Sequence, residues 1–230
     1  MVQFKSEFWH PSIATDIVLF TIRNKTLNIL LAKRKDNGMW AIPGGFLKKG
    51  ETLRQCAERE LKEEAGISVP YLEQFENFSD PNRDNRNPNT QVVSVAFIAI
   101  HPSGKLKIKA NTDVSDVNWF EYNTIPSLAF DHNEICIKAR LKLDQLAKDK
   151  PDLLFPFLEE EFTLTELHET LLIVSSDISS LKEKRNFRKW VGEYNNGNGL
   201  VIETGNYRTG NHRPAKLYKK QYLLRGTIFE

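Results

Sequence analysis

Glutamates cluster in one short segment that follows the glycine pair Gly44-Gly45, GGFLKKGETLRQCAERELKEEAGI. Carboxylate oxygens are the ligands that Mg²⁺ prefers, and Mg²⁺ usually completes its shell with substrate phosphates. Glycine has no Cβ, so its backbone can approach a metal or a phosphate closely. The segment therefore predicts a site for a divalent cation and a phosphate-containing substrate.

A helix of about four turns must position these glutamates. Thr52 with Gln55 three residues later fits a capping box, and Gly66 fits the position just beyond the helix end. At about 100° per residue, one apolar stripe runs along this helix, formed by Leu53, Ala57, Leu61 and Ala65. Glu64 falls inside the stripe and Glu60 at its edge, so an entirely solvated acidic face does not fit the pattern.

The charges of this helix need a positive partner. Like charges one turn apart cost roughly 0.2–0.5 kcal/mol per pair, and burying unpaired carboxylates costs more. Arg59 reaches Glu63 at the i+4 position, but one arginine cannot compensate Glu51, Glu60, Glu63 and Glu64 together. We therefore expect bound Mg²⁺, with Mn²⁺ as a substitute.

The complete spacing resembles the signature of the Nudix hydrolases: Gly45, five residues, Glu51, seven residues, then RELKEEAGI from Arg59 to Ile67. This resemblance implies an α/β/α sandwich around a mixed sheet and Mg²⁺-dependent hydrolysis of a nucleoside diphosphate linked to another moiety. It also implies roles for individual residues. Glu60, Glu64 and the Gly45 carbonyl would bind the metal, Glu63 would assist in ligation or water activation, and Arg59 would orient the carboxylates. The general base stays open among Glu63, Glu51, Asp113 and Asp116.

A second segment, Ser79 to Arg86, resembles the corresponding part of ADP-ribose-processing Nudix proteins. Arg83 and Arg86 would bind phosphates or ribose there, because arginine forms paired hydrogen bonds with such groups. The alternative is an ordinary charged turn, and Asn85 stands where those relatives usually carry proline. Phe130-Asp131-His132 also occurs in that subgroup, and we expect His132 to be a helix-start or packing residue.

The whole-chain composition is that of a globular protein. The chain has 230 residues, a formal net charge of +2, 40% apolar and 27% charged residues, which excludes collagen-like and tail-like disordered chains. No stretch approaches ~18 uncharged apolar residues, so no membrane span is expected. The N-terminus lacks the pattern of a secretory signal, and Cys56 and Cys136 have no metal-binding spacing. A cytoplasmic location is the expectation.

The predicted elements alternate strand and helix in the first 150 residues. Strands are predicted over residues 17–21, 27–31, 91–100 and 117–122, and helices over residues 52–65 and 133–148. The second helix ends just before Pro151. We place a domain boundary near residue 150, giving domains 1–150 and 151–230.

Charge separates the two ends of the second domain. Residues 152–181 carry seven acidic and no basic residues, whereas residues 182–230 carry eleven basic and four acidic ones. Helices, then a basic helix from Lys182 to Val191, then a glycine-rich hairpin suit a winged helix, whose third helix enters the major groove of DNA. The candidate DNA-binding residues lie on this helix and hairpin: Lys184, Arg185, Asn186, Arg188, Lys189, Arg208, Arg213 and Lys216.

Residues 185–189 and 213–218 resemble the winged-helix domain of Nudix-related transcriptional regulators, which bind ADP-ribose or sugar-type effectors and act as homodimers. Two functions follow, and they are compatible. One is a hydrolase that cleaves ADP-ribose or a similar nucleoside diphosphate derivative and carries a domain for double-stranded DNA. The other is a ligand-sensing regulator with little hydrolase activity. A third, weaker interpretation makes the basic segment a dimerisation module.

Overall fold

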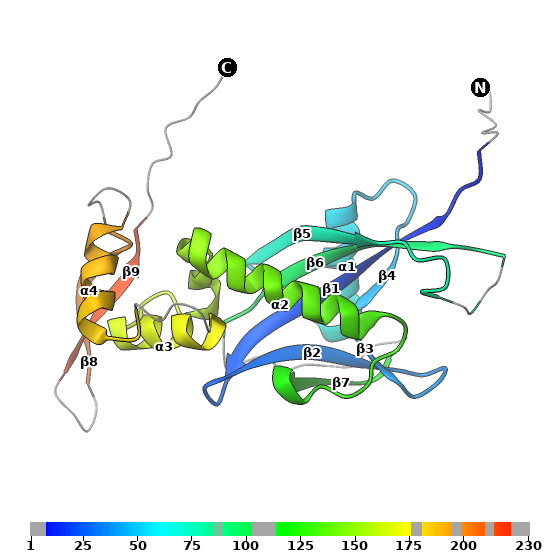
Figure 1. Cartoon of the computed structure of the whole chain (residues 1–230). Coiled ribbons are helices and arrows are strands. Elements are labelled where there is room, and N and C mark those ends of the chain that lie inside the picture. The colour runs from blue at the N-terminus through cyan, green and yellow to red at the C-terminus, as the bar shows by residue number, and fades with distance from the viewer. Residues whose placement is uncertain are drawn as a thin grey trace, which may run out of the picture. The chain divides into compact units, whose positions relative to one another are not determined.

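The computed structural model describes residues 8–84, 86, 89–102, 114–175, 181–194, 199–209 and 214–221 (Figure 1). The chain forms two compact units. The first takes in the described residues of Met1–Thr21, Asn28–His101 and Lys105–Lys142, and the second those of Ile22–Leu27, Pro102–Gly104 and Leu143–Glu230. The boundary near residue 150 remains a prediction. Among the described residues, no helix is long and apolar enough to cross a membrane.

A seven-stranded mixed sheet forms the centre of the first unit. Its path is β3-β2-β1-β6-β5, with β4 paired to β1 and β7 paired to β2. The strands are β1 (Ser12–Arg23), β2 (Thr26–Arg34), β3 (Trp40–Ala41), β4 (Gly44–Phe46), β5 (Tyr71–Phe78), β6 (Val92–Ile100) and β7 (Val114–Glu121). Because β1 and β6 run parallel while β5 and β6 run antiparallel, the sheet is mixed, as predicted.

Helices cover both faces of this sheet. Successive strand residues point to opposite faces, so Ile17 and Leu19 pack in one core cluster with Ala57 and Leu61 of α1 (Leu53–Ala65). Figure 1 shows α2 (His132–Asp149) crossing the other face. The predicted α/β/α sandwich is therefore confirmed.

The ends of α1 are those that its sequence predicts. The Thr52 side chain accepts a hydrogen bond from the backbone N–H of Gln55, and the Gln55 side chain accepts one from the backbone N–H of Thr52. Gly66 ends the helix with φ +70°, a left-handed conformation that glycine adopts without a steric penalty. These two caps fix how far the helix extends and thus where its glutamates lie.

The second unit contains helices followed by a two-stranded sheet. Its elements are the 3₁₀ helix η2 (Pro151–Phe157), α3 (Leu164–Val174), α4 (Lys184–Glu193), β8 (Val201–Arg208) and β9 (Ala215–Lys220). Phe162 forms an antiparallel bridge with Tyr218 of β9, which ties the segment before α3 to the hairpin. The described order matches the predicted winged helix.

Several differences from the predicted elements concern strands, and they include the short strands β3 and β4, which were not predicted. β1 and β2 extend beyond the predicted residues 17–21 and 27–31, since polar residues at their ends continue the backbone pairing. β5 was not predicted, because YLEQFENF mixes polar and apolar residues without a clean alternation. η1 (Tyr122–Thr124) follows β7 where the predicted strand continued to Tyr122.

Candidate functional site

Arg59 gathers three of the four glutamates of the predicted site. Its guanidinium donates to Glu51 through Nε (2.6 Å) and Nη2 (3.0 Å), and its Nη1 donates to Glu60 (2.5 Å) and Glu63 (3.0 Å). Nη2 also donates to the Phe46 carbonyl of β4 at 3.0 Å. The arginine therefore fixes the carboxylates to one another and to the glycine segment.

Glu64 is the glutamate that Arg59 does not reach. Its carboxylate accepts a 3.3 Å hydrogen bond from the backbone N–H of Gly44, and no cationic side chain among the described residues pairs with it. Burial, followed by the negative charge of Glu60, raises the pKa of Glu64 to about 8. A half-buried carboxylate that forms no ion pair with a described side chain fits a site for a cation.

Gly45 leaves room for the Glu60 carboxylate. A Cβ at residue 45 would lie 2.3 Å from Glu60 Oε1, so the carboxylate of Glu60 would have to move. Gly44 is more strictly confined, because its Cβ would lie 2.3 Å from the backbone carbonyl oxygen of Thr15. Behind this segment, the buried Cys56 thiol donates to the Gly45 carbonyl at 3.7 Å and accepts from Thr15 Oγ1 at 3.4 Å.

Gly44, Gly45, Glu60 and Glu64 line a cleft of about 490 Å³, which carries acidic and basic groups together, whereas Glu51, Arg59 and Glu63 lie outside its lining. Its acidic side chains include Asp16, Glu60, Glu64 and Asp84, and its basic ones are Arg34, Lys35, Arg83 and Arg86. Among the described residues, no group of three or more His, Cys, Asp or Glu side chains forms a complete metal cage. Mg²⁺ is commonly held by one or two carboxylates plus water and substrate phosphates, so an all-protein cage is not required.

Arg83 lies below the cleft surface, with its side chain 4% exposed. It donates to both oxygens of Asp131 at 2.8 and 2.7 Å, and to Asp16 at 3.0 Å. Asp16 also accepts from Ser94 Oγ at 2.5 Å. The guanidinium is thus engaged by two carboxylates, and phosphate binding by Arg83 stays a prediction.

Arg86 differs from Arg83 because its side chain is 44% exposed. Its Nε and Nη2 donate to the two oxygens of Asp84 at 2.8 and 2.5 Å, and this pairing holds the pKa of Asp84 below its usual range. The remaining edge of the guanidinium faces away from Asp84, which suits a ligand in the cleft.

None of the three described candidates for the general base, Glu51, Glu63 and Asp116, is among the residues that line the cleft. Asp116 is exposed on β7, where its carboxylate accepts from the backbone N–H of Val117, and it does not line the cleft. Asp113 lies outside the described residues. Glu63, which is half-exposed and also 3.5 Å from Lys48 Nζ, stays beside Glu60 and Arg59.

Sequence reasoning missed two residues of the cleft, Asp16 and Arg34. Asp16 is the only carboxylate of β1 and is buried there, and a charged residue directly before the apolar run of this strand was the signal that could have identified it. His132, expected to start a helix or to pack, does both. It begins α2, and its Nδ1 accepts from the backbone N–H of Ile42 at 3.1 Å.

The candidate DNA-binding residues divide into two groups. On α4, Phe187 and Val191 are buried, whereas the predicted residues are exposed: Lys184, Arg185, Asn186, Arg188 and Lys189. On the hairpin, Arg208 pairs with Glu166 of α3, and Lys216 pairs with Glu203 at 2.9 Å. Arg213 lies outside the described residues.

Comparison with known proteins places this geometry in a family. Residues 11–139 match the Nudix domain, and residues 154–219 match the NrtR DNA-binding winged helix domain. The chain belongs to the Nudix family. Its Nudix domain is followed by a winged-helix domain of the NrtR type, as the sequence predicted.

This Nudix protein is similar to two characterised proteins and to one solved structure of a protein–DNA complex. An ADP-ribose pyrophosphatase of Methanocaldococcus jannaschii is 38% identical over 131 residues, 56% of this chain and 72% of that protein. The ADPR responsive transcriptional repressor NtrR of Acinetobacter baylyi is 32% identical over 222 residues, 94% of this chain and 84% of that protein. The crystal structure of Shewanella oneidensis NrtR complexed with a 27mer DNA is 31% identical, with a TM-score of 0.72 over 91% of this chain and 93% of that one.

Proposed function

We propose that the Nudix domain hydrolyses the diphosphate of ADP-ribose or a similar nucleoside diphosphate derivative with Mg²⁺, or with Mn²⁺ in its place. We propose further that the winged-helix domain binds double-stranded DNA. The observation that carries the first part is the pair of carboxylates in the cleft, the buried Glu60 and the half-buried Glu64, of which Glu64 has no ion-pair partner among the described residues. The relation to an ADP-ribose pyrophosphatase supports this substrate class.

In this proposal Glu60, Glu64 and the Gly45 carbonyl hold the metal. Bound Mg²⁺ supplies charge neutralisation of the diphosphate and acidifies water. Arg59 holds the carboxylates of Glu51, Glu60 and Glu63 in fixed positions through its four hydrogen bonds to these residues. Glu63 assists in metal binding or accepts a proton from the attacking water, and Arg86 binds a phosphate through its unoccupied edge. Positioning and charge stabilisation carry most of phosphoryl chemistry, so rigid placement of these groups is their main contribution.

The test is AMP release from ADP-ribose and from a panel of other nucleoside diphosphate derivatives, with and without Mg²⁺. We expect Mg²⁺-dependent release that disappears in Glu64→Gln. Glu58→Gln is the matched control, because Glu58 lies on the exposed face of the same helix and pairs with Arg54. A wild-type chain that turns over no member of the panel with either metal would overturn the hydrolase.

A second function, ligand-sensing regulation, is supported by the relation to an ADPR responsive repressor over 94% of the chain. We propose that ADP-ribose binding in the Nudix cleft changes the affinity of the winged helix for duplex DNA. Glu64→Gln separates this function from catalysis, because turnover is removed while the arginines of the cleft remain. A duplex affinity that ADP-ribose leaves unchanged in wild type and in Glu64→Gln would contradict sensing.

A further inference from the structure

Phe130 has a backbone conformation that aromatic residues rarely adopt. Its φ is +56°, and the other described non-glycine residues with positive φ are Asn24 and Lys25, which form the tight turn between β1 and β2. A residue held in the left-handed region costs roughly 1–3 kcal/mol and persists where its surroundings determine it, often at functional sites. Phe130 lies between β7 and α2, at the edge of the cleft.

Hydrogen bonds on both sides hold Phe130 in this conformation. The backbone N–H of Ala129 donates to the Trp40 carbonyl at 2.8 Å, which fixes the preceding residue. The following residue, Asp131, is held by the paired hydrogen bonds from Arg83. His132 comes next and accepts from the backbone N–H of Ile42. The turn is therefore held by strand β3, by the 79–86 segment and by the residue that follows β3.

The ring of Phe130 lies against two guanidinium groups from distant parts of the chain. Arg34 Cζ at the end of β2 is 4.8 Å from the ring centroid, and Arg86 Cζ is 4.7 Å from it. Both distances are within the range of cation–π attraction. One aromatic ring thus holds together two positive charges that would otherwise repel each other.

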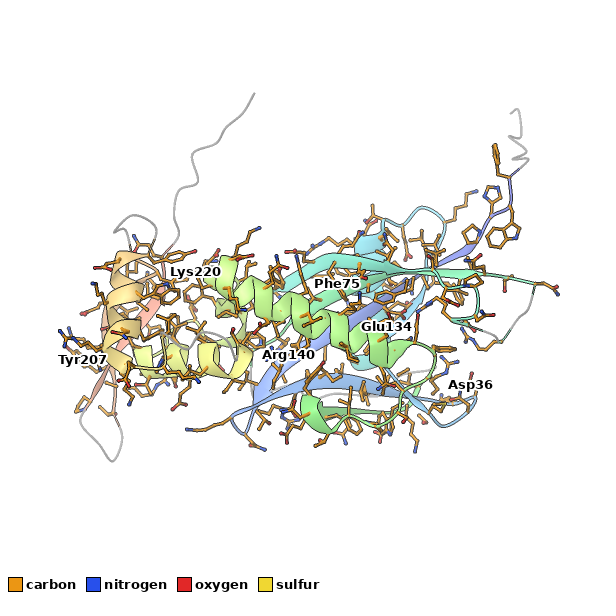
Figure 2. All side chains as sticks on the ribbon, in the orientation of Figure 1. Asp36, Phe75, Glu134, Arg140, Tyr207 and Lys220 are labelled. Carbon is orange, nitrogen blue, oxygen red and sulfur yellow. The ribbon has the colours of Figure 1, made fainter. Side chains whose placement is uncertain are left out.

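Each arginine is anchored on one edge and open on the other. Arg34 donates through Nε and Nη2 to Asp36 at 3.0 and 2.5 Å, as Arg86 does to Asp84. Asp36, labelled in Figure 2, lies in the turn after β2. Among the described residues, Nη1 of neither arginine has a hydrogen-bond partner. Both side chains line the cleft that also contains Glu60 and Glu64.

We propose that Phe130 is a specificity-determining residue whose ring holds Arg34 and Arg86 as a paired receptor for a phosphate group of the substrate. This inference rests on the proposed function, because it assigns the metal to the glutamates and one phosphate directly to the arginines. A substrate with two linked phosphates contacts both the metal held by the glutamates and the Arg34–Arg86 pair. A monophosphate contacts only one of these two at a time. Arg83 is then a positioning residue, which acts through Asp131 on the Phe130 turn.

The experiment measures the Kd of ADP-ribose by calorimetry on the full-length chain in EDTA, together with KM and kcat in Mg²⁺. Phe130→Leu keeps an apolar side chain but removes the ring, and we expect Kd and KM to rise about tenfold, the scale of a partly desolvated cation–π contact. Phe130→Tyr restores a ring and should recover most of the lost affinity. Phe75→Leu is the matched control, because Phe75 lies on β5 and does not line the cleft (Figure 2).

Phe130→Asn keeps the comparison valid if leucine at a positive φ unfolds the chain. Asparagine tolerates the left-handed region, so this variant preserves the turn without the ring. We expect it to bind as weakly as Phe130→Leu. Wild-type affinity in a folded Leu or Asn variant would overturn the role of Phe130. Absence of ADP-ribose binding and turnover in the wild-type chain would instead overturn the proposed function.

Discussion

At the residue scale, the four glutamates in and beside α1 differ in their hydrogen-bond partners, because Arg59 contacts three of them and not the fourth. Arg59 binds Glu51, Glu60 and Glu63, and Glu64 is left with one backbone donor. The helical angles alone placed Glu64 within the apolar stripe and Glu60 at its edge, whereas in the structure Glu60 is the buried carboxylate and Glu64 is half-buried. The choice of partners by Arg59 depends on side-chain conformations that the sequence pattern does not define.

Gly45→Ala tests this arrangement with one added methyl group. The new Cβ would lie 2.3 Å from Glu60 Oε1, so Glu60 must leave its position next to Arg59 and Glu64. We expect a loss of Mg²⁺-dependent turnover of about a hundredfold, in line with the effect of small misplacements in active sites. Steady-state kinetics on ADP-ribose measures this loss. Gly192→Ala, at an open and exposed position of α4, is the comparison, and equal activity of the two variants would contradict the prediction.

The sequence located the arginines near the site but could not assign their partners. Arg83 was predicted to contact the substrate, which stays a prediction, but its hydrogen bonds to Asp16, 67 residues earlier, and to Asp131, 48 residues later, were not foreseen. Such long-range pairs follow from strand order and register, which local patterns do not encode. Arg34 was missed for the same reason, since it meets Phe130 and Arg86 only in the folded chain.

At the scale of the element, helix ends were the most predictable feature. Capping depends on residues within one turn, so Thr52, Gln55 and Gly66 sufficed to bound α1. α3 follows the same rule, because Thr163 and Glu166 form a capping box at its start. β5 was missed because a half-buried strand is defined by its pairing with β6 rather than by its own composition.

Thr163→Ala should destabilise the winged-helix domain by about 1 kcal/mol, the usual value of a lost N-terminal cap. The Thr163 hydroxyl accepts from the backbone N–H of Glu166 and completes a capping box. Urea unfolding followed by circular dichroism measures the change. Thr165→Ala lies on the exposed side of the same turn and should change stability much less. Equal effects of both substitutions would rule out Thr163 as the energetically important cap.

His132, at the start of α2, should make stability depend on pH. Burial lowers the pKa of His132 below its ordinary value of 6.5, opposed by Asp16 and Asp131 and reinforced by Arg83 and Arg34. As the pH falls through about 6.5, the unfolded chain binds a proton that the folded chain does not, so folding stability is lost on acidification. The slope can reach about 1.4 kcal/mol per pH unit.

The measurement is the free energy of unfolding between pH 8 and pH 5. His132→Gln should be less stable than wild type at pH 8, because Ile42 loses its acceptor, but should show a flatter dependence on pH. His10→Gln removes an exposed histidine and should keep the wild-type slope. If His132→Gln also kept that slope, the pH dependence would arise elsewhere.

At the scale of the whole molecule, the net charge of +2 hides a strong partition. Residues 152–181 carry −7, residues 182–230 carry +7 and the first 151 residues carry +2. The sequence predicted a Nudix domain followed by a winged-helix domain. The matches to residues 11–139 and 154–219 agree with this prediction. The contribution of each basic residue to DNA binding depends on its ion pairs within the protein, which the sequence does not specify.

The ion pairs predict unequal contributions to DNA binding. The affinity for duplex DNA should fall steeply with salt, and Arg188→Ala should reduce the magnitude of the log–log slope by about 0.9, the value for one phosphate contact. Lys216→Ala should change it less, because Lys216 is already paired with Glu203. Fluorescence anisotropy across a salt series gives the slopes. Lys49→Ala, an exposed charge change in the first unit, is the control, and a salt-independent affinity would contradict DNA binding.

The two cysteines add a consequence for the study of motion in this molecule. Cys56 lies on α1 behind the Gly45 carbonyl and Cys136 lies on α2, and both thiols are free and buried. Burial raises the pKa of both, to about 12 for Cys136. Because thiolates react and thiols do not, an alkylating reagent modifies each cysteine at a rate that reports how often its helix leaves the sheet. The alkylation rates of Cys56 and Cys136 therefore report separately on the opening of α1 and of α2, and no label has to be introduced.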